Sequence, residues 1–286
     1  MIPPLRRYAL TLAMLSATLW ASAAAGSDRV RTDQVQARLV SEVAEVAPYS
    51  GFWVGLRLKI KAGWHTYWSN PGDSGLATRI DWELPEGMVA GAIRWPVPHR
   101  FAIGDLMNYG YADEVVLLTR MSVWPPAGTG SPVTLAANAS WLVCAHICIP
   151  QEGRFELRLP SAAGAPAVDA EARSLLGSYA WRLPEPAREK ATFRATADTI
   201  RLRVPLPPEW PREPEDAWFF PERYGVIQHA AAQSTRADAG GQVKTLVMSL
   251  ARGELKHERL ERLRGVLVLR YGNDSERGIS VDAEPG

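Results

Sequence analysis

Apolar and polar residues alternate along most of this chain in the short runs that are typical of β-strands. From Gln34 to about Pro160, runs rich in β-branched and aromatic residues alternate with clusters of turn-forming residues. In the run Phe52–Ile60, every second residue is large and apolar, which is the period of a half-buried strand. Further runs with β-type composition are Ile80–Leu84, Val115–Val123, Val133–Val143 and Arg154–Leu159. Short strands at this spacing predict a β-sandwich.

A second group of β-type runs follows a segment with the composition of a linker. Residues 162–166 are small or proline, Val168–Tyr179 can form one short helix, and Leu183–Pro186 contains two prolines. The runs beyond it are Thr192–Pro205, Ala217–Phe220, Tyr224–His229, Val243–Leu250 and Gly265–Tyr271. We therefore predict an all-β chain with one sandwich at residues 26–165, a linker with a short helix at 166–188, and a second sandwich at 189–286.

Composition and charge agree with this fold class and narrow the kinds of function. The 286 residues are 47% hydrophobic and 22% charged, as in an ordinary globular protein. The 23 Gly, 22 Pro and 11 Trp interrupt the chain too often for long helices. A formal net charge of +1 gives no indication of a nucleic-acid partner or a polybasic membrane patch. The sequence also contains no glycine-rich phosphate loop, no H-E-x-x-H zinc motif and no nucleophile elbow.

The first 25 residues have the three parts of an export signal. Arg6 and Arg7 form a positive segment, Tyr8–Trp20 is apolar, and the small residues at 21–25 offer cleavage sites. The apolar run is short for a membrane span, and no other segment reaches about 18 apolar residues. We expect a signal peptide at residues 1–25 and no integral membrane segment in the mature chain, with an uncleaved amino-terminal anchor as the alternative. In an oxidising compartment, a pair of cysteines forms a disulfide by default.

The two cysteines, Cys144 and Cys148, lie in the segment Trp141–Pro150, and their spacing sets a geometric condition. On a continuous strand they would lie about 13 Å apart, whereas a disulfide needs Cα atoms within about 7 Å of one another. A bond between them therefore requires residues 145–147 to form a turn. A ring this short restrains the unfolded chain little, and strained, exposed disulfides are those that exchange readily. The spacing alone leaves an inert structural disulfide and an exchanging one as alternatives.

The same residues offer a metal site as a further alternative. If the segment stays extended, Cys144, His146 and Cys148 project from one face of a strand. Two thiolates and an imidazole suit Cu(I) or zinc. A fourth ligand would have to come from elsewhere in the chain, from His65, His99 or Met107. A histidine between two cysteines can also act as a neighbour that tunes a thiolate.

Seven segments resemble the amino-terminal periplasmic domain of the DsbD thiol:disulfide interchange proteins, and the likeness is strongest to the ScsB (suppressor of copper sensitivity) branch. They are Gly63–Gly75, Trp82–Gly87, Arg94–Pro98, Tyr109–Val116, Trp141–Pro150, Trp218–Pro221 and Val226–Gln233. The resemblance implies immunoglobulin-like β-sandwich domains, here two in tandem after a signal peptide, and a redox-active cysteine pair. It also implies a periplasmic location and the transfer of reducing equivalents to or from partner proteins.

The resemblance further implies roles for individual residues. In this family the domain receives electrons from a thioredoxin-like domain through a mixed disulfide, so Cys148 would form the intermolecular bond and Cys144 would resolve it. The family's aromatic positions at the cysteine site match His65 and Tyr67, which share one face of an extended strand. Exchange needs a thiolate, so we expect a lowered pKa for one cysteine, with His146 or His65 as the local cation.

The family also has a cap loop that shields the cysteine pair. It corresponds here to about His99–Tyr109, where Phe101, Asp105 and Met107 are the candidates for lining the site.

This chain departs from the family in two ways that affect the predicted partners. The C-x₃-C spacing is tighter than in the best-known DsbD domains and is typical of the ScsB side. The chain also ends at Gly286 without a transmembrane electron conduit or a thioredoxin-like domain. We therefore expect separate partners: thioredoxin-like periplasmic proteins and a membrane electron-conduit protein.

The functional prediction is a periplasmic interchange protein that works through Cys144 and Cys148 without a cofactor. It would be a candidate component of a protein-disulfide reductase system, with a link to copper tolerance. The alternative is a periplasmic Cu(I)-binding module that uses Cys144, His146 and Cys148.

Overall fold

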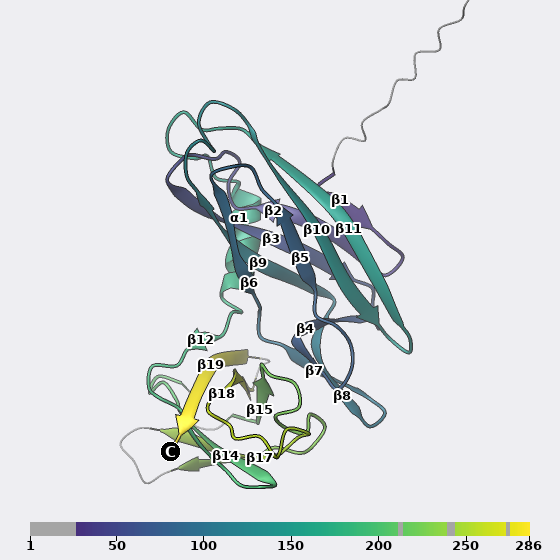
Figure 1. Ribbon diagram of the computed structural model, residues 1–286, viewed down its shortest axis with the longest axis vertical. Coiled ribbons are helices and arrows are strands. Elements are labelled where there is room, and N and C mark those ends of the chain that lie inside the picture. The colour runs from purple at the N-terminus through teal and green to yellow at the C-terminus, as the bar shows by residue number, and fades with distance from the viewer. Residues whose placement is uncertain (1–26, 211–213, 239–243, 273–274) are drawn as a thin grey trace, which may run out of the picture.

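Two β-sandwiches follow one another along the chain, with one helix between them in sequence (Figure 1). The structure is a computed structural model and describes residues 27–210, 214–238, 244–272 and 275–286. The predicted all-β fold with two sandwiches is confirmed, whereas the predicted signal peptide at residues 1–25 lies outside the described residues. Within the described ranges, no helix has the length and apolar character that a membrane crossing requires.

The first sandwich consists of two sheets that enclose one core. One sheet has the strand order β1 (Arg29–Arg31), β2 (Val35–Ser41), β3 (Ser50–Ile60), β9 (Glu114–Val123), β6 (Met88–Arg94). The other has the order β11 (Cys148–Leu159), β10 (Val133–Cys144), β4 (His65–Gly72), β8 (Leu106–Ala112), β7 (His99–Ile103), and β5 (Arg79–Glu83) pairs with β10. Buried side chains from both sheets, among them Leu58, Leu117, Leu135 and Phe155, form the core between them.

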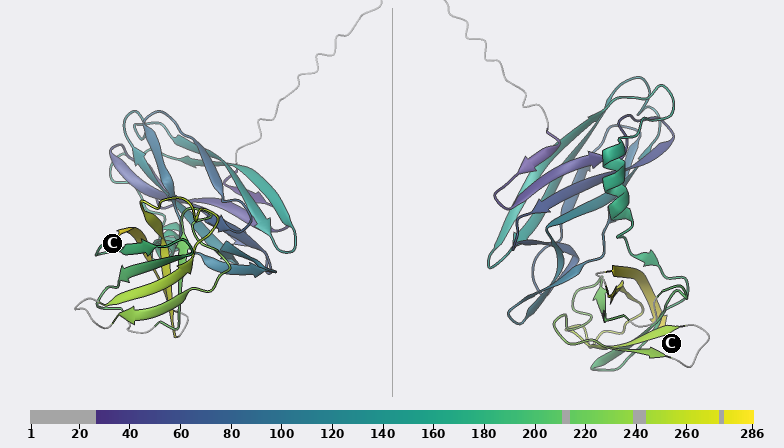
Figure 2. Two further views of the ribbon diagram at one scale, coloured as in Figure 1. Left: turned by 60° about the horizontal axis from the view of Figure 1, so that its bottom comes forward. Right: turned by 180° about the vertical axis from the view of Figure 1, so that it is seen from behind.

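The alternation along β3 explains how this sheet is covered on both faces. The five apolar side chains at every second position from Phe52 to Ile60 are buried in the core. Helix α1 (Ala170–Ala180) lies across the opposite face of β2, β3 and β9 (Figure 2). Its approach depends on Gly55, because a Cβ at this position would lie 2.6 Å from Leu176 Cδ2 and 2.4 Å from Val116 Cγ1.

The strands of the second sandwich form one continuous hydrogen-bonded series. The strands at the two ends of this series lie on opposite sides of a second core. The strand order is β15 (Asp216–Pro221), β18 (Leu263–Tyr271), β19 (Ser275–Pro285), β13 (Thr192–Ala195), β14 (Thr199–Pro205), β17 (Thr245–Ala251), β16 (Ser234–Asp238), and β12 (Glu185–Pro186) pairs with β19. Phe219 from β15, Leu267 from β18 and Met248 from β17 are all fully buried in this core.

Most predicted runs are strands, and the differences have local causes. Arg154–Leu159 is only the last part of the longer strand β11, and Thr192–Pro205 is divided by a turn into β13 and β14. The prediction of a strand at Tyr224–His229 is wrong. Gly225 has a φ of +74° in this segment, and Ile227 makes an isolated bridge rather than a ladder.

The predicted helix and the predicted strand Val243–Leu250 both occur with shifted ends. The helix spans Ala170–Ala180, and its first turn is capped by Asp169, whose carboxylate accepts a hydrogen bond from Ala172 N (2.9 Å). Strand β17 begins at Thr245, and Val243 lies outside the described residues.

The second sandwich packs against the end of the first that carries β4, β7 and β8 (Figure 1). Consecutive residues of β15 divide between the two cores: Phe219 is buried in the second, whereas Trp218 and Phe220 belong to the core of the first. The Phe220 ring lies 4.7 Å from the ring of Tyr109 and 6.2 Å from that of Trp68, both edge-on. The two sandwiches therefore share a buried aromatic contact.

We expect Gly55→Ala to lower the free energy of unfolding by about 1–3 kcal/mol, because the added methyl group would overlap Leu176 and Val116. Gly177→Ala is the matched control in α1 itself, where no atom lies within 4 Å of an added Cβ. It should stabilise the protein by up to about 1 kcal/mol through helix propensity. Urea unfolding followed by circular dichroism measures both. Equal effects of the two substitutions would contradict the close packing of α1 on β3.

Candidate functional site

The two cysteines lie at the end of a long hairpin. Strands β10 and β11 pair without a register shift from Val133 opposite Leu159 to Cys144 opposite Cys148. Residues 145–147 reverse the chain, and the cysteines form a disulfide with their Cα atoms 4.1 Å apart. Residues 145–147 therefore form the turn that a disulfide between Cys144 and Cys148 requires.

The two halves of the disulfide differ in accessibility. Cys144 is 0% exposed, whereas Cys148 is exposed together with its neighbours His146 and Ile147, the latter by 64%. Thiol–disulfide exchange begins when a thiolate reaches one of the two sulfur atoms. Attack on this disulfide is thus open at Cys148 and hindered at Cys144.

Strand β4 brings His65 and Tyr67 beside the disulfide. His65 pairs with Cys144 at the end of β10. Tyr67 is buried, and its hydroxyl oxygen lies 3.6 Å from Cys148 Sγ. Because a disulfide sulfur carries no hydrogen, Tyr67 is the donor in this contact. Burial raises the pKa of Tyr67 above its ordinary value, which keeps the donating O–H protonated at neutral pH.

Gly75 supports the ring of Tyr67 from behind. It has a φ of +104°, and a Cβ at this position would lie 2.2 Å from Cε1 of Tyr67. Only glycine therefore lets the chain pass the ring at this distance. The composition of residues 70–75 indicates a turn, but no local signal in the sequence reveals this contact.

Phe101 on β7 covers His65 from the other side. The two rings are stacked with centroids 4.6 Å apart and planes 9° apart, and the His65 ring also meets Tyr67 edge-on at 5.2 Å. Burial lowers the pKa of His65 below its ordinary value of 6.5, so the ring is neutral at neutral pH. The expectation that His65 supplies a cation beside the cysteines is therefore wrong.

The other predicted lining residues lie in different surroundings. His146 lies on the turn at 145–147 and is exposed beside Cys148. Asp105 is exposed at the turn between β7 and β8, where it lines a hollow together with residues of the second sandwich such as Tyr224. Met107 binds the Asp73 carboxylate through its backbone N–H (2.7 Å). Of the three cap-loop candidates, only Phe101 contacts a residue beside the disulfide, namely His65. Asp105 lines the hollow and Met107 binds Asp73, both away from the disulfide.

The metal hypothesis assumed an extended segment, and this assumption is wrong. The chain reverses between Cys144 and Cys148, so these residues and His146 do not project from one face of a strand. Among the residues that the structure describes, no three His, Cys, Asp or Glu side chains gather closely enough to hold a metal ion.

The sequence of this site matches a known family. The family model described as "Thiol:disulfide interchange protein DsbD, N-terminal" matches residues 35–160. Residues 35–160 form a DsbD N-terminal-like domain. The match includes both cysteines and the three rings of His65, Tyr67 and Phe101, and the second sandwich lies outside it.

Solved structures extend the comparison beyond the DsbD N-terminal-like domain. The N-terminal periplasmic domain of ScsB from Proteus mirabilis matches with a TM-score of 0.63 at 15% identity, over 91% of this chain and 98% of that chain. This likeness shows that the chain shares its fold with the ScsB domain across both sandwiches. A protein of unknown function from Porphyromonas gingivalis W83 matches at 12% identity over 86% of this chain and 99% of that chain, with a TM-score of 0.23. No curated protein matches the sequence.

The difference in burial predicts a difference in thiol reactivity within the DsbD N-terminal-like domain. The variant Cys144→Ser retains only the exposed Cys148, whereas Cys148→Ser retains only the buried Cys144. We expect the first variant to react with a chromogenic aromatic disulfide at least about tenfold faster, because reaction needs an accessible thiolate. Equal rates in the two variants, each measured on folded protein, would contradict the assignment of Cys148 as the exposed sulfur.

Burial of His65 predicts a loss of stability in acid. Since the pKa of His65 is lower in the folded protein than in the unfolded chain, the unfolded chain binds more protons below about pH 6.5. The free energy of unfolding should therefore be fully retained above that pH and fall as the pH drops through it. His65→Phe should reduce this slope in urea unfolding measured from pH 7.5 to 5. His257→Phe, which removes an exposed histidine, is the control. The prediction fails if both variants keep the slope of the unaltered protein.

Proposed function

We propose that this chain is a periplasmic thiol:disulfide interchange protein that passes reducing equivalents through the Cys144–Cys148 pair. The observation that carries the proposal is a disulfide with one exposed and one buried half at the end of a hairpin. The family match supports it, because the matched proteins are described as thiol:disulfide interchange proteins. The matched ScsB domain is described as periplasmic, which supports that location for this chain.

Reduction of the protein begins at the exposed sulfur. A partner dithiol attacks Cys148 Sγ as a thiolate, a mixed disulfide forms, and the bond between the two cysteines breaks. Cys144 Sγ leaves with the electron pair and takes up a proton. The second thiol of the partner then attacks the partner's own sulfur in the mixed disulfide and releases Cys148 as a thiolate. The partner is oxidised to a disulfide, and this chain gains two electrons and one proton, with Cys148 left as the thiolate.

Oxidation of the protein follows the same path in reverse. The Cys148 thiolate attacks a disulfide of the acceptor, and Cys144 then attacks Cys148 Sγ, which restores the internal disulfide and releases the reduced acceptor. The O–H of Tyr67, 3.6 Å from Cys148 Sγ, can donate to the thiolate and so favours its formation. Cys148 is the attacking group in this scheme, Cys144 is the resolving group, and Tyr67 supplies a hydrogen bond.

The proposed partners are thioredoxin-like periplasmic proteins, with a membrane electron-conduit protein as the donor. The surroundings of Cys148 support a protein partner, since Ile147 presents an exposed apolar side chain next to the reactive sulfur. The link to copper tolerance rests on the resemblance to the ScsB branch and stays a prediction.

A redox titration of residues 26–286 tests the proposed function. The metal-free protein is equilibrated in thiol–disulfide buffers, its free thiols are alkylated, and the modified cysteines are counted by mass. We expect a midpoint between about −120 and −270 mV, the range of pairs that exchange. A midpoint below about −300 mV would identify a structural disulfide and contradict the proposal. If no internal disulfide forms in any buffer, the proposal is contradicted as well, because exchange needs this bond.

A further inference from the structure

Two segments of the redox site are held in place from the second sandwich. One is the segment 70–75, which includes the last residues of β4 and ends at Gly75 against the ring of Tyr67. The other is strand β7, which carries Phe101 over His65. We call them the turn arm and the β7 arm. Both arms also contact the second sandwich. These contacts have no part in the exchange chemistry described above, so they need a separate explanation.

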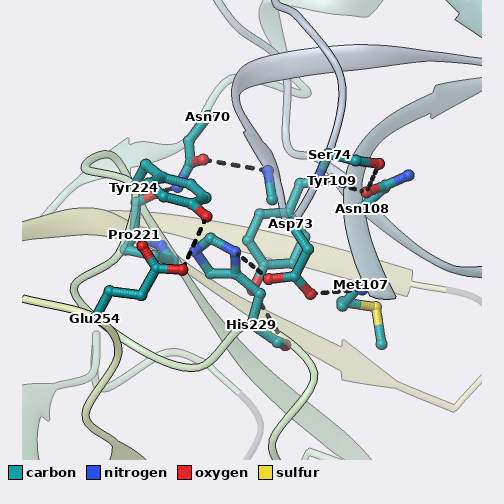
Figure 3. A network of polar contacts seen from close by, with 11 residues as sticks. Asn70, Asp73, Ser74, Met107, Asn108, Tyr109, Pro221, Tyr224, His229 and Glu254 are labelled. Atoms are coloured by element: carbon teal, nitrogen blue, oxygen red, sulfur yellow. Dashed lines mark hydrogen bonds and ion pairs between the residues drawn. The ribbon is translucent and has the colours of Figure 1, made fainter. Parts of the chain in front are cut away.

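The turn arm is bound to the second sandwich through Asp73 and Asn70. His229 Nδ1 lies 3.1 Å from Asp73 Oδ1, and the imidazole is almost completely buried. The other carboxylate oxygen of Asp73 accepts a hydrogen bond from Met107 N on β8 (2.7 Å), so Asp73 links β8 to His229 (Figure 3). Asn70, itself buried, donates to the carbonyl of Pro221 (2.7 Å).

His229 is enclosed by two aromatic rings and by Asp73 where the two sandwiches meet. Its ring lies 5.2 Å from the ring of Tyr109 and 5.5 Å from that of Tyr224, and the Tyr224 hydroxyl in turn contacts Glu254 (Figure 3). Burial lowers the pKa of His229 more than Asp73 raises it, so the neutral ring donates Nδ1–H to Asp73. Without this donor, Asp73 Oδ1 would lose its hydrogen bond to His229 while the carboxylate remains partly buried, which is unfavourable.

The β7 arm is bound through Arg100, the residue beside Phe101. The Arg100 guanidinium forms an ion pair with Asp216 and lies 4.2 Å from the ring centroid of Trp218. Successive side chains of a strand point to opposite faces. Arg100 therefore contacts the second sandwich while Phe101 contacts His65, and a single strand connects the two.

We infer that the second sandwich positions the redox site, with His229 and Arg100 as positioning residues. His229 holds the turn arm so that Gly75 keeps the Tyr67 hydroxyl at Cys148 Sγ. Arg100 holds the β7 arm so that Phe101 keeps His65 against Tyr67. The inference rests on the proposed function for its biological meaning, but its structural content concerns the environment of one thiol.

The test measures the pKa of the Cys148 thiol from the pH profile of its alkylation by iodoacetamide. The Cys144→Ser background is used, in which Cys148 is the only thiol of the chain. We expect His229→Ala to raise this pKa by about half a unit, a roughly threefold loss of thiolate at neutral pH. His229→Asn, whose amide can replace Nδ1 as the donor to Asp73, should restore the original value.

A double substitution shows whether the effect passes through Tyr67. Tyr67→Phe should raise the Cys148 pKa by itself, because it removes the donor to the thiolate. Adding His229→Ala to Tyr67→Phe should then change nothing further, since the two residues act in one path. A simple loss of folding stability would not give this pattern.

Arg100→Ala provides a second variant that does not depend on a buried residue. It should raise the same pKa, and the shift should disappear in a Phe101→Ala background. Arg203→Ala is the matched control, since it removes an ion pair with Asp238 within the second sandwich, away from both arms. If His229→Ala does not fold, the comparison of Arg100→Ala with Arg203→Ala decides the question.

An unchanged Cys148 pKa in both His229→Ala and Arg100→Ala overturns the inference, as does an equal shift in Arg203→Ala. The experiment uses a single thiol and no disulfide, so its result is separate from the redox titration. A structural disulfide found by titration would reject the proposed function while leaving this measurement to decide the positioning role.

Discussion

The geometry of the redox site depends on the unbroken register of the β10–β11 hairpin. Twelve residue pairs align without a bulge, and the last places Cys144 opposite Cys148. The Trp141–Gln151 pair near the tip is also joined through its side chains, since Trp141 Nε1 donates to Gln151 Oε1 (2.9 Å). A slip of one residue would move every side chain of the strand to the other face of the sheet. The register thus decides both that the cysteines can bond and which of them is buried.

Strands β4 and β7, beside the hairpin tip, each contact both the redox site and the second sandwich. Strand β4 is buried on both faces at His65–Trp68. Tyr67 on one face contacts the disulfide, and Trp68 on the other contacts Phe220 of the second sandwich. Strand β7 divides in the same way between Phe101 and Arg100. The residue of β7 that contacts the second sandwich is thus the direct neighbour of the residue that contacts the site.

Period-two alternation identified β3, because one face of this strand lies in the core. Runs of β-branched and other apolar residues identified β9 and β10. Neither pattern identified β4, whose polar residues Thr66 and Asn70 are buried and leave no alternation. Neither identified β16, an edge strand whose residues are mostly exposed. The segment at Tyr224–His229 has strand-like composition but turns at Gly225. Local composition cannot report these features, since they follow from which surface covers each segment.

The sequence by itself determined the all-β class, the need for a turn between Cys144 and Cys148, and the resemblance to the DsbD domain, because these depend on local periodicity, spacing and motifs. Only the tertiary structure decided that Cys148 is the exposed sulfur and that His65 is neutral. It alone joined Asp73 to His229, which lies 156 residues further along the chain. Burial, pKa and hydrogen-bond partners are set by side chains that are distant in sequence, and folding brings them together.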